Sequence, residues 1–295
     1  MLRSLINKFN RKVSAILGTA RIPDIFQTVS RLHEVSESIL IDNFLEDKLF
    51  KNPKYIGNNR LTRHHSSVYT QNGEDGIIQE IFKRIGTRSK FFVEFGVHGI
   101  KNNSTYLLTK AWKGAWIGGN NIASRNAQKN FSQLLANDTL RFKNAWINKD
   151  NIEDLFDSLQ VPKQFDLLSI DLDGNDYWIW QAITKYKPRV VIIEYNATFP
   201  ADSEWIMEYN DKHIWKGNSY FGASLKSLTK LGEDKGYKLV GCDFNGCNAF
   251  FIDEKENLSL FESPFSAENH YEPPRYHLRK SSGHKQGFGS FITQE

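Results

Sequence analysis

Five short apolar runs, each followed by a polar loop and a segment of helical periodicity, constrain the fold of this chain more than any other feature. The runs are residues 91–96, 114–119, 141–147, 165–173 and 189–196, and the helical segments between them are residues 104–111, 123–136, 151–159 and 176–186. Alternation of this kind predicts right-handed βαβ units and a mostly parallel sheet with helices on both faces. A further helical pattern at residues 77–85 precedes the first strand.

The pattern of elements changes after residue 220. Residues 220–236 predict a helix that ends at Gly236, and two more apolar runs follow at residues 237–243 and 247–253. The turn between these runs is too short for a parallel crossover, so they predict an antiparallel hairpin. Five parallel strands, a helix and a terminal hairpin form the element order of the Rossmann-like methyltransferase fold, with seven strands in its sheet. We therefore expect an α/β protein of this class.

Three regions are expected along the chain. Residues 1–65 predict an N-terminal helical extension, residues 66–260 a catalytic domain, and residues 261–295 a C-terminal tail or flap. Residues 2–17 have apolar side chains at helical spacing, four basic residues and no acid. Such a helix lies on an anionic membrane surface, as a peripheral contact, or packs against its own or a partner subunit. The sequence leaves both alternatives open, and with them a homo-oligomer.

The composition excludes several classes of protein. With 38 basic and 34 acidic residues and no basic stripe outside the termini, the chain is not expected to bind nucleic acid. It has no apolar run long enough to span a membrane. Its only two cysteines, Cys242 and Cys247, argue against a disulfide framework. We therefore expect a cytoplasmic protein, located at the inner face of the membrane if the N-terminal helix binds lipid.

The stretch FVEFGVHGIKNNST runs from the first predicted strand into a loop and the start of a helix. Ligands of open parallel sheets bind at the carboxyl ends of the strands, where this loop lies. Gly96 and Gly99 allow close approach to the backbone, and Glu94 is placed to hold loop amides or a cationic group. His98, in the same loop, is a candidate base. A tight strand-to-helix turn without a ligand would also use glycines, so both interpretations stay open.

The stretch LLSIDLDGNDYWIW, residues 167–180, places carboxylates at the end of a buried strand. Asp171 and Asp173 are two positions apart and therefore point to the same side. Glu194 ends the next strand, which is expected beside this one. Carboxylates that converge repel each other unless a cation or a proton intervenes, so they suit a divalent metal such as Mg²⁺ or a general base. The alternative is that Asp176 caps the next helix and the other two are solvated.

Several motifs together resemble the FkbM-type methyltransferases, in an uncharacterised bacterial branch. They are QNGEDGIIQEIF, FVEFGV, WKGAWI, LLSIDLDGNDYWIW, VVIIEYNATFP and YFGASLKSLTKLGEDKGYKLVGC followed by NAFFI, spread over about residues 70–255. The resemblance implies transfer of a methyl group from S-adenosylmethionine to an oxygen of a sugar or surface-glycan precursor, such as a nucleotide-sugar or a lipid-linked glycan. It places Glu94 and Gly96 on the first cofactor motif, and Asp171 and Asp173 on the acidic motif of the fourth strand.

Two places depart from that family. In the first cofactor loop, Gly99 comes one position early and Ile100 stands where a later glycine is usual. The second strand ends in Gly118 and Gly119, where relatives commonly have an acidic residue for the ribose hydroxyls. Asn120 or Asn121 would then take its place as a neutral cofactor contact, although a neutral hydrogen bond is weaker than a charge-assisted one. The alternative function is a degenerate methyltransferase-fold protein that binds a glycan or a protein partner without methyl transfer. The long segment 198–222, rich in aromatic residues, predicts a lid or a sugar-binding loop, or simple packing.

Overall fold

The structure is a computed structural model that describes residues 22–57, 59–97, 99–119, 121–278 and 287–289. The chain forms two compact units, Met1–Lys48 with Lys280–His284, and Leu49–Arg279 with Lys285–Glu295. The larger unit contains all seven strands. It therefore holds the whole of the predicted sheet.

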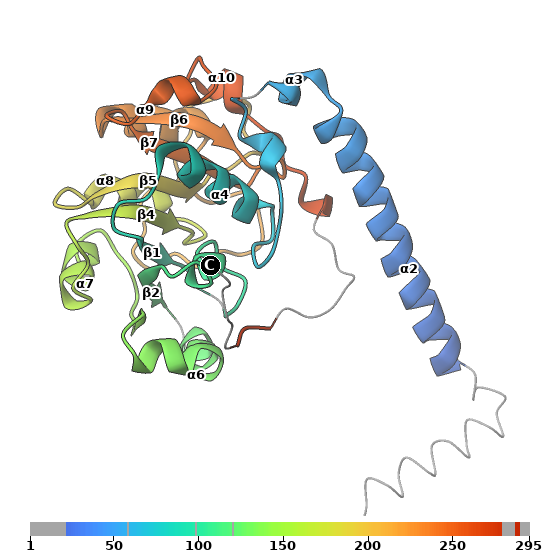
Figure 1. The fold of residues 1–295 in the computed structure, drawn as a ribbon, viewed down its shortest axis with the longest axis horizontal. Coiled ribbons are helices and arrows are strands. Elements are labelled where there is room, and N and C mark those ends of the chain that lie inside the picture. The colour runs from blue at the N-terminus through green and yellow to red at the C-terminus, as the bar shows by residue number, and fades with distance from the viewer. Residues whose placement is uncertain (1–21, 58, 98, 120, 279–286, 290–295) are drawn as a thin grey trace, which may run out of the picture. The chain divides into compact units, whose positions relative to one another are not determined.

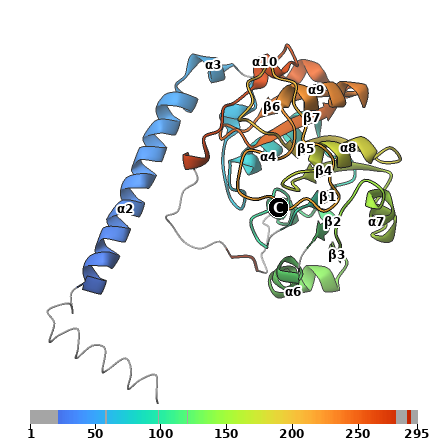
Figure 2. The same ribbon diagram turned by 180° about the vertical axis from the view of Figure 1, so that it is seen from behind.

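The larger unit is built on one seven-stranded sheet of order β3-β2-β1-β4-β5-β7-β6 (Figure 1; Figure 2 gives the view from behind). Its strands are β1 (Phe91–Phe95), β2 (Lys113–Gly118), β3 (Leu140–Asn144), β4 (Gln164–Ile170), β5 (Lys187–Glu194), β6 (Tyr237–Cys242) and β7 (Asn248–Asp253). The first five strands are parallel, and β7 is antiparallel to both β5 and β6. The predicted Rossmann-like methyltransferase fold with its terminal hairpin is thus confirmed. Cys242 and Cys247 are buried free thiols.

The helices expected between residues 77 and 236 are all present, although some are shorter than their apolar pattern. They are α4 (Glu74–Ile85), α5 (Thr105–Leu108), α6 (Asn121–Ala136), α7 (Ile152–Ser158), α8 (Asp176–Ala182) and α9 (Leu225–Asp234). Gly86 ends α4 with a φ of 67°, and the side chain of Ser224 caps α9 by accepting from the Ser227 amide. Shorter helices are α3 (Pro53–Ile56), η2 (Thr62–His64), η3 (Leu258–Leu260), α10 (Ala267–His270) and η4 (Tyr276–Leu278).

Helices cover both faces of the sheet because successive strand residues point to opposite sides. Phe91, Val93 and Phe95 of β1 belong to a core shared with α7, α8 and α9. Phe92, between them, belongs to a second core shared with α4, α5 and α6. The strand core is buried on both sides, so the parallel strands read as continuous apolar runs in the sequence.

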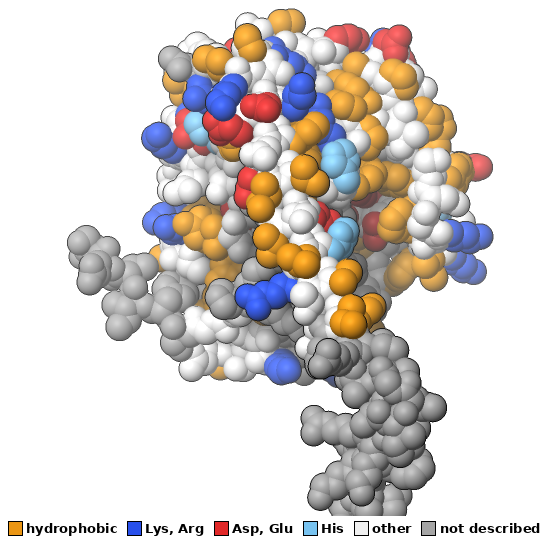
Figure 3. All heavy atoms as spheres, turned by 90° about the vertical axis from the view of Figure 1, so that its right-hand side faces the viewer, with side chains coloured by type: hydrophobic (Ala, Val, Ile, Leu, Met, Phe, Trp, Pro, Cys, Tyr) orange, Lys and Arg blue, Asp and Glu red, His pale blue; other side chains and the backbone are white. Residues whose placement is uncertain are grey.

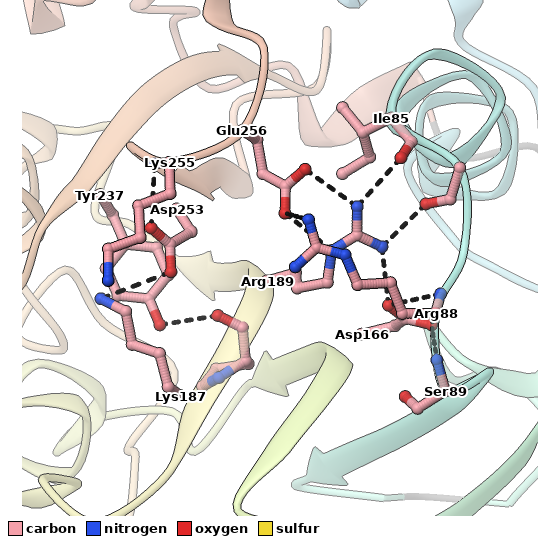
Figure 4. Close-up of polar contacts among 12 residues, drawn as sticks. Ile85, Arg88, Ser89, Asp166, Lys187, Arg189, Tyr237, Asp253, Lys255 and Glu256 are labelled. Atoms are coloured by element: carbon pink, nitrogen blue, oxygen red, sulfur yellow. Dashed lines mark hydrogen bonds and ion pairs between the residues drawn. The ribbon is translucent and has the colours of Figure 1, made fainter.

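A buried ion-pair network joins β4, β5 and the end of α4 (Figure 4). The Arg189 guanidinium is 2.8 Å from Asp166 and 2.8 Å from Glu256, and it donates to the Gly86 carbonyl at 2.8 Å. Asp166 also accepts from the three backbone amides of residues 88–90. This network fixes the loop that leads from α4 into β1.

In the smaller unit the described element is α2 (Ile22–Leu45), which is followed by a π-helical turn η1 (Glu46–Phe50). Apolar side chains of α2 are exposed to solvent (Figure 3). No helix in the described ranges is both long and apolar enough to cross a membrane. Residues 2–17 lie outside the described residues, so their membrane contact stays a prediction.

The C-terminal region, expected as a tail or flap, packs on the larger unit as far as residue 278. The Tyr271 hydroxyl donates to the Ala197 carbonyl at 2.6 Å. The buried Glu272 carboxylate accepts from Tyr55 and forms ion pairs with Lys54 and Arg275. This part of the predicted tail is therefore an integral piece of the fold.

Candidate active site

Glu94 organises the loop that follows β1. Its side chain is buried, and it accepts hydrogen bonds from the backbone amides of Asn103, at 2.7 Å, and Ser104, at 2.9 Å. The Ser104 hydroxyl also donates to Glu94 and in turn accepts from the Trp116 indole at 2.8 Å. Burial raises the pKa of Glu94 to about 7, although these hydrogen bonds act to lower it. Of the two uses expected for this carboxylate, the structure shows the holding of loop amides.

Gly96 brings the loops after β1 and β4 into direct backbone contact. Its φ is 71°, and a Cβ built there would lie 1.6 Å from the carbonyl oxygen of Asp171. Only glycine fits such a position. β1 and β4 are neighbours at the point where the strand order reverses, which is where ligands bind in sheets of this kind. Gly99, with a φ of 107°, accepts from Asn102 through its carbonyl at 2.7 Å.

Three carboxylates converge at the carboxyl ends of β4 and β5. Asp171, Asp173 and Glu194 each place an oxygen within 4.8 Å of the other two. Burial raises the pKa of Asp171 well above its ordinary value, and the charges of Asp173, Asp176 and Glu94 raise it further. The structure thus brings together the residues that the sequence suggested, in an arrangement that favours a shared proton or a cation. Their roles as metal ligands or base stay predictions.

Asp176 holds the turn that presents these carboxylates. It is fully buried and accepts from the backbone amides of Leu172, at 2.8 Å, and Gly174, at 2.9 Å. Burial raises its pKa to about 6. Asp176 is the first residue of α8, its carboxylate bonds to the turn before that helix, and Asn175 occupies the N-cap position, so the structure does not show the helix-capping role considered for Asp176. Asp171 and Asp173 are half-buried in the cluster and not freely solvated.

Glu74, at the start of α4, is a site residue that the sequence reasoning did not select. Its carboxylate accepts from the side chains of Asn72 and Asn248, both at 2.8 Å. Asn248 lies opposite Glu194 in the β5–β7 ladder. The charge of Glu74 contributes to the raised pKa of both Asp171 and Glu94. The available signal was an acidic residue in the first turn of the helix before β1.

Residues 198–222 lie against the turn after β4. The Gly222 amide donates to the Gly174 carbonyl at 3.0 Å, and the Asn175 side chain donates to the Asn210 carbonyl at 2.7 Å. His213 packs on Gly174, where a Cβ would lie 2.4 Å from the imidazole ring. The rings of Trp215 and Tyr220 are exposed. The segment thus combines packing with exposed aromatic faces beside the cluster, and its use as a lid stays a prediction.

The end of β2 carries no carboxylate. The strand ends at Gly118, and the following Gly119 lies beneath the indole of Trp146, with 3.4 Å between a built Cβ and that ring. The Asn121 side-chain oxygen accepts from Asn144 at 3.0 Å. Asn120, the other residue proposed at the end of β2, lies outside the described residues, as does His98, the candidate base in the loop after β1. Cofactor contacts at this edge stay predictions.

No protein-family model matches the chain, and no curated protein matches it. Among solved structures, the N-terminal domain of EvdMO1 with SAH bound is similar with a TM-score of 0.41 and 10% identity, covering 61% of this chain and 80% of that one. A putative O-methyltransferase from Klebsiella pneumoniae is similar with a TM-score of 0.40 and 11% identity, and the match covers 75% of this chain and 97% of that one. An O-methyltransferase from Bacillus cereus in complex with SAH is similar with a TM-score of 0.39 and 15% identity, and the match covers 65% of this chain and 83% of that one. Likenesses this distant assign no activity to the chain.

Proposed function

We propose that this protein is an S-adenosylmethionine-dependent O-methyltransferase that acts on a sugar or surface-glycan precursor, either a nucleotide-sugar or a lipid-linked glycan. The observation that carries the proposal is the contact of Gly96 with the backbone of Asp171. This contact lies between β1 and β4, where the strand order reverses, in a sheet whose strand β7 is antiparallel to its neighbours. The carboxylate cluster lies at this same point. A fold hosts many functions, so the proposal depends on this site.

The residues present fit S-adenosylmethionine in charge. The cofactor supplies a methyl group on a positively charged sulfur and also carries an ammonium group. Carboxylates at the ends of β4 and β5 favour a cationic ligand. Gly96 allows the loops after β1 and β4 to meet, Gly99 gives the first of these loops a positive φ, and Glu94 fixes the amides of that loop. Asn121 begins α6, just after the end of β2. These residues would hold the cofactor.

The carboxylate cluster is suited to activate an acceptor hydroxyl. The raised pKa of Asp171 makes its ionised carboxylate a stronger proton acceptor than that of an ordinary aspartate. Asp173 and Glu194 have the oxygen ligands that Mg²⁺ prefers, and the three residues together would hold one such ion. His98 is the alternative base. Exposed Trp215 and Tyr220 offer flat faces to a sugar ring.

Calorimetric titration with S-adenosylmethionine and S-adenosylhomocysteine tests the cofactor half of the proposal. Transfer of labelled methyl groups to a panel of nucleotide-sugars and lipid-linked sugars tests the acceptor half. We expect Asp171→Asn to abolish transfer while binding of S-adenosylhomocysteine persists, and the exposed Asp154→Asn to change neither. Full activity of Asp171→Asn would remove this site from the mechanism. Full activity in EDTA would show that the reaction does not need Mg²⁺, and the role of Asp171 as a base would stand.

The second candidate function is binding of a glycan or protein partner without methyl transfer. It is favoured by Gly118 and Gly119, which leave the end of β2 without a carboxylate for the ribose hydroxyls. If neither cofactor form binds at millimolar concentration, this function replaces the first. If both bind and no acceptor of the panel is methylated, the acceptor class is wrong and the cofactor assignment stands.

A further inference from the structure

The helix α2 exposes a broad apolar face. Seven large apolar side chains between positions 25 and 40 are each 48% to 73% exposed: Ile25, Phe26, Val29, Leu32, Val35, Ile39 and Leu40 (Figure 3). At 100° per residue all seven fall on one half of the helix, whereas Gln27, Ser30, Arg31 and Glu34 fall on the other. A contiguous apolar surface of this kind marks a contact site.

The charge of α2 disfavours an anionic membrane as its partner. Its sequence has four acidic residues and one basic residue, which gives a net charge of −3 with histidine neutral. Helices that lie on anionic lipid have basic residues on their polar face. The partner of α2 is therefore expected to be apolar on the side that faces α2, with basic residues at the edges of that side.

Residues 2–17 have this chemistry. Their apolar residues recur at helical spacing, and they include four basic residues and no acidic one. As a helix, this segment would be about 24 Å long, the same length as positions 25–40 of α2. Residues 18–21 separate it from the start of α2, and a loop of about four residues is typical of a hairpin of two antiparallel helices.

We propose that the apolar face of α2 is the docking surface for residues 2–17 of the same chain, which fold back on it as an antiparallel helix. In this arrangement the end of one helix adjoins the start of the other, so Phe9 faces Val29. Arg3 and Lys12 lie at the two edges of the apolar side of the segment, where they come near Glu37 and Asp24 at the edges of the apolar face of α2. The docked segment is held by α2 and is not available to a membrane or to a second copy of the chain.

Cysteine cross-linking in the full-length protein tests the contact. The natural Cys242 and Cys247 are buried, so they are kept. The pair Phe9→Cys with Val29→Cys is compared with Arg11→Cys with Val29→Cys under mild oxidation. Arg11 lies about 200° around the proposed helix from Phe9 and points away from α2. We expect the first pair to form an intrachain disulfide about tenfold faster than the second.

Two results of this experiment overturn the proposal, and a sedimentation measurement distinguishes the cases of the first. Equal rates for the two pairs exclude the fixed contact. Covalent dimers as the main product of the first pair identify a second copy as the occupant. Equal rates combined with sedimentation on vesicles of equal parts phosphatidylcholine and phosphatidylglycerol identify lipid as the occupant.

Hydrogen exchange gives an independent measurement without cysteines. Leu32→Gln places an amide within the apolar face, and Ser30→Gln places the same amide on the polar face of α2. We expect the backbone amides of residues 2–17 to be protected in the wild type and in Ser30→Gln, and to exchange faster in Leu32→Gln. Unchanged exchange in Leu32→Gln overturns the proposal.

Discussion

Replacing Glu94 with glutamine should change how the stability of the protein depends on pH. Folding raises the pKa of this carboxyl from 4.5 to about 7, mainly through burial. The neutral form is therefore favoured in the folded state, and the folded protein binds the proton more tightly than the unfolded chain. The stability that this group contributes is complete below the unfolded pKa and is lost as the pH rises through the folded pKa.

The size of the effect follows from the shift in pKa. A rise of about 2.5 pH units corresponds to about 3 kcal/mol of unfolding free energy, at 1.36 kcal/mol per unit. Glutamine does not titrate, so Glu94→Gln should not lose this amount. The NH₂ group of the glutamine amide is a donor, however, and it faces one of the two backbone N–H donors, those of Asn103 and Ser104, that the carboxylate accepts from. The loss of this hydrogen bond lowers the unfolding free energy by about 1–3 kcal/mol.

The variant should therefore be less stable than the wild type at acidic pH. The unfolding free energy of the variant minus that of the wild type should rise by about 3 kcal/mol between about pH 4.5 and pH 8. Urea unfolding at several pH values and constant ionic strength measures the difference, in which other titrating groups cancel to first order. The exposed Glu254→Gln is the control and should show a constant difference. A difference that stays constant for Glu94→Gln as well would refute the assignment of a raised pKa to this carboxyl.

Two further substitutions test the packing of the larger unit, one at the site and one near the amino ends of β4 and β5. Gly96→Ala should abolish binding of S-adenosylhomocysteine and lower the melting temperature. The control Gly217→Ala has a similar φ of 72° but no atom within 4 Å of the added Cβ, so it should lose only about 1 kcal/mol of stability through backbone strain. Equal melting temperatures of the two variants would contradict the contact of Gly96 with the loop after β4. Arg189→Met should cost about 3–5 kcal/mol because it leaves a buried carboxylate unpaired, and the exposed Arg88→Met at most about 1 kcal/mol. Urea unfolding of both variants measures the two costs, and similar values would show that the network of Arg189 is not buried in solution.

The fold was predictable from the sequence because burial determines the pattern of the strands and helices. Strands covered on both faces require continuous apolar runs, and the short turn at residues 243–247 allows only an antiparallel hairpin. The convergence of Asp171 with Glu194 also followed, since β4 and β5 are neighbours and both end at the same edge of the sheet. These inferences need only local pattern and the rules of strand connection.

The parts that were not predictable depend on contacts distant in the chain. Glu74 reaches the site through Asn248, which is 174 positions away. Whether Glu94 binds a ligand or the amides of its own loop depends on where the backbone amides of Asn103 and Ser104 lie, and the sequence pattern does not give their positions. The packing of residues 261–278 on the domain rests likewise on single polar contacts such as that of Tyr271 with residue 197.

The strand β7 lies between β5 and β6, although it is the last of the seven to be synthesised. Until residues 248–253 have left the ribosome, the apolar strand β5 has an open edge and β6 has no strand to pair with. An open apolar edge pairs readily with other chains. A cell that makes this protein must therefore keep the nascent chain from such pairing until the final strand has emerged and inserted.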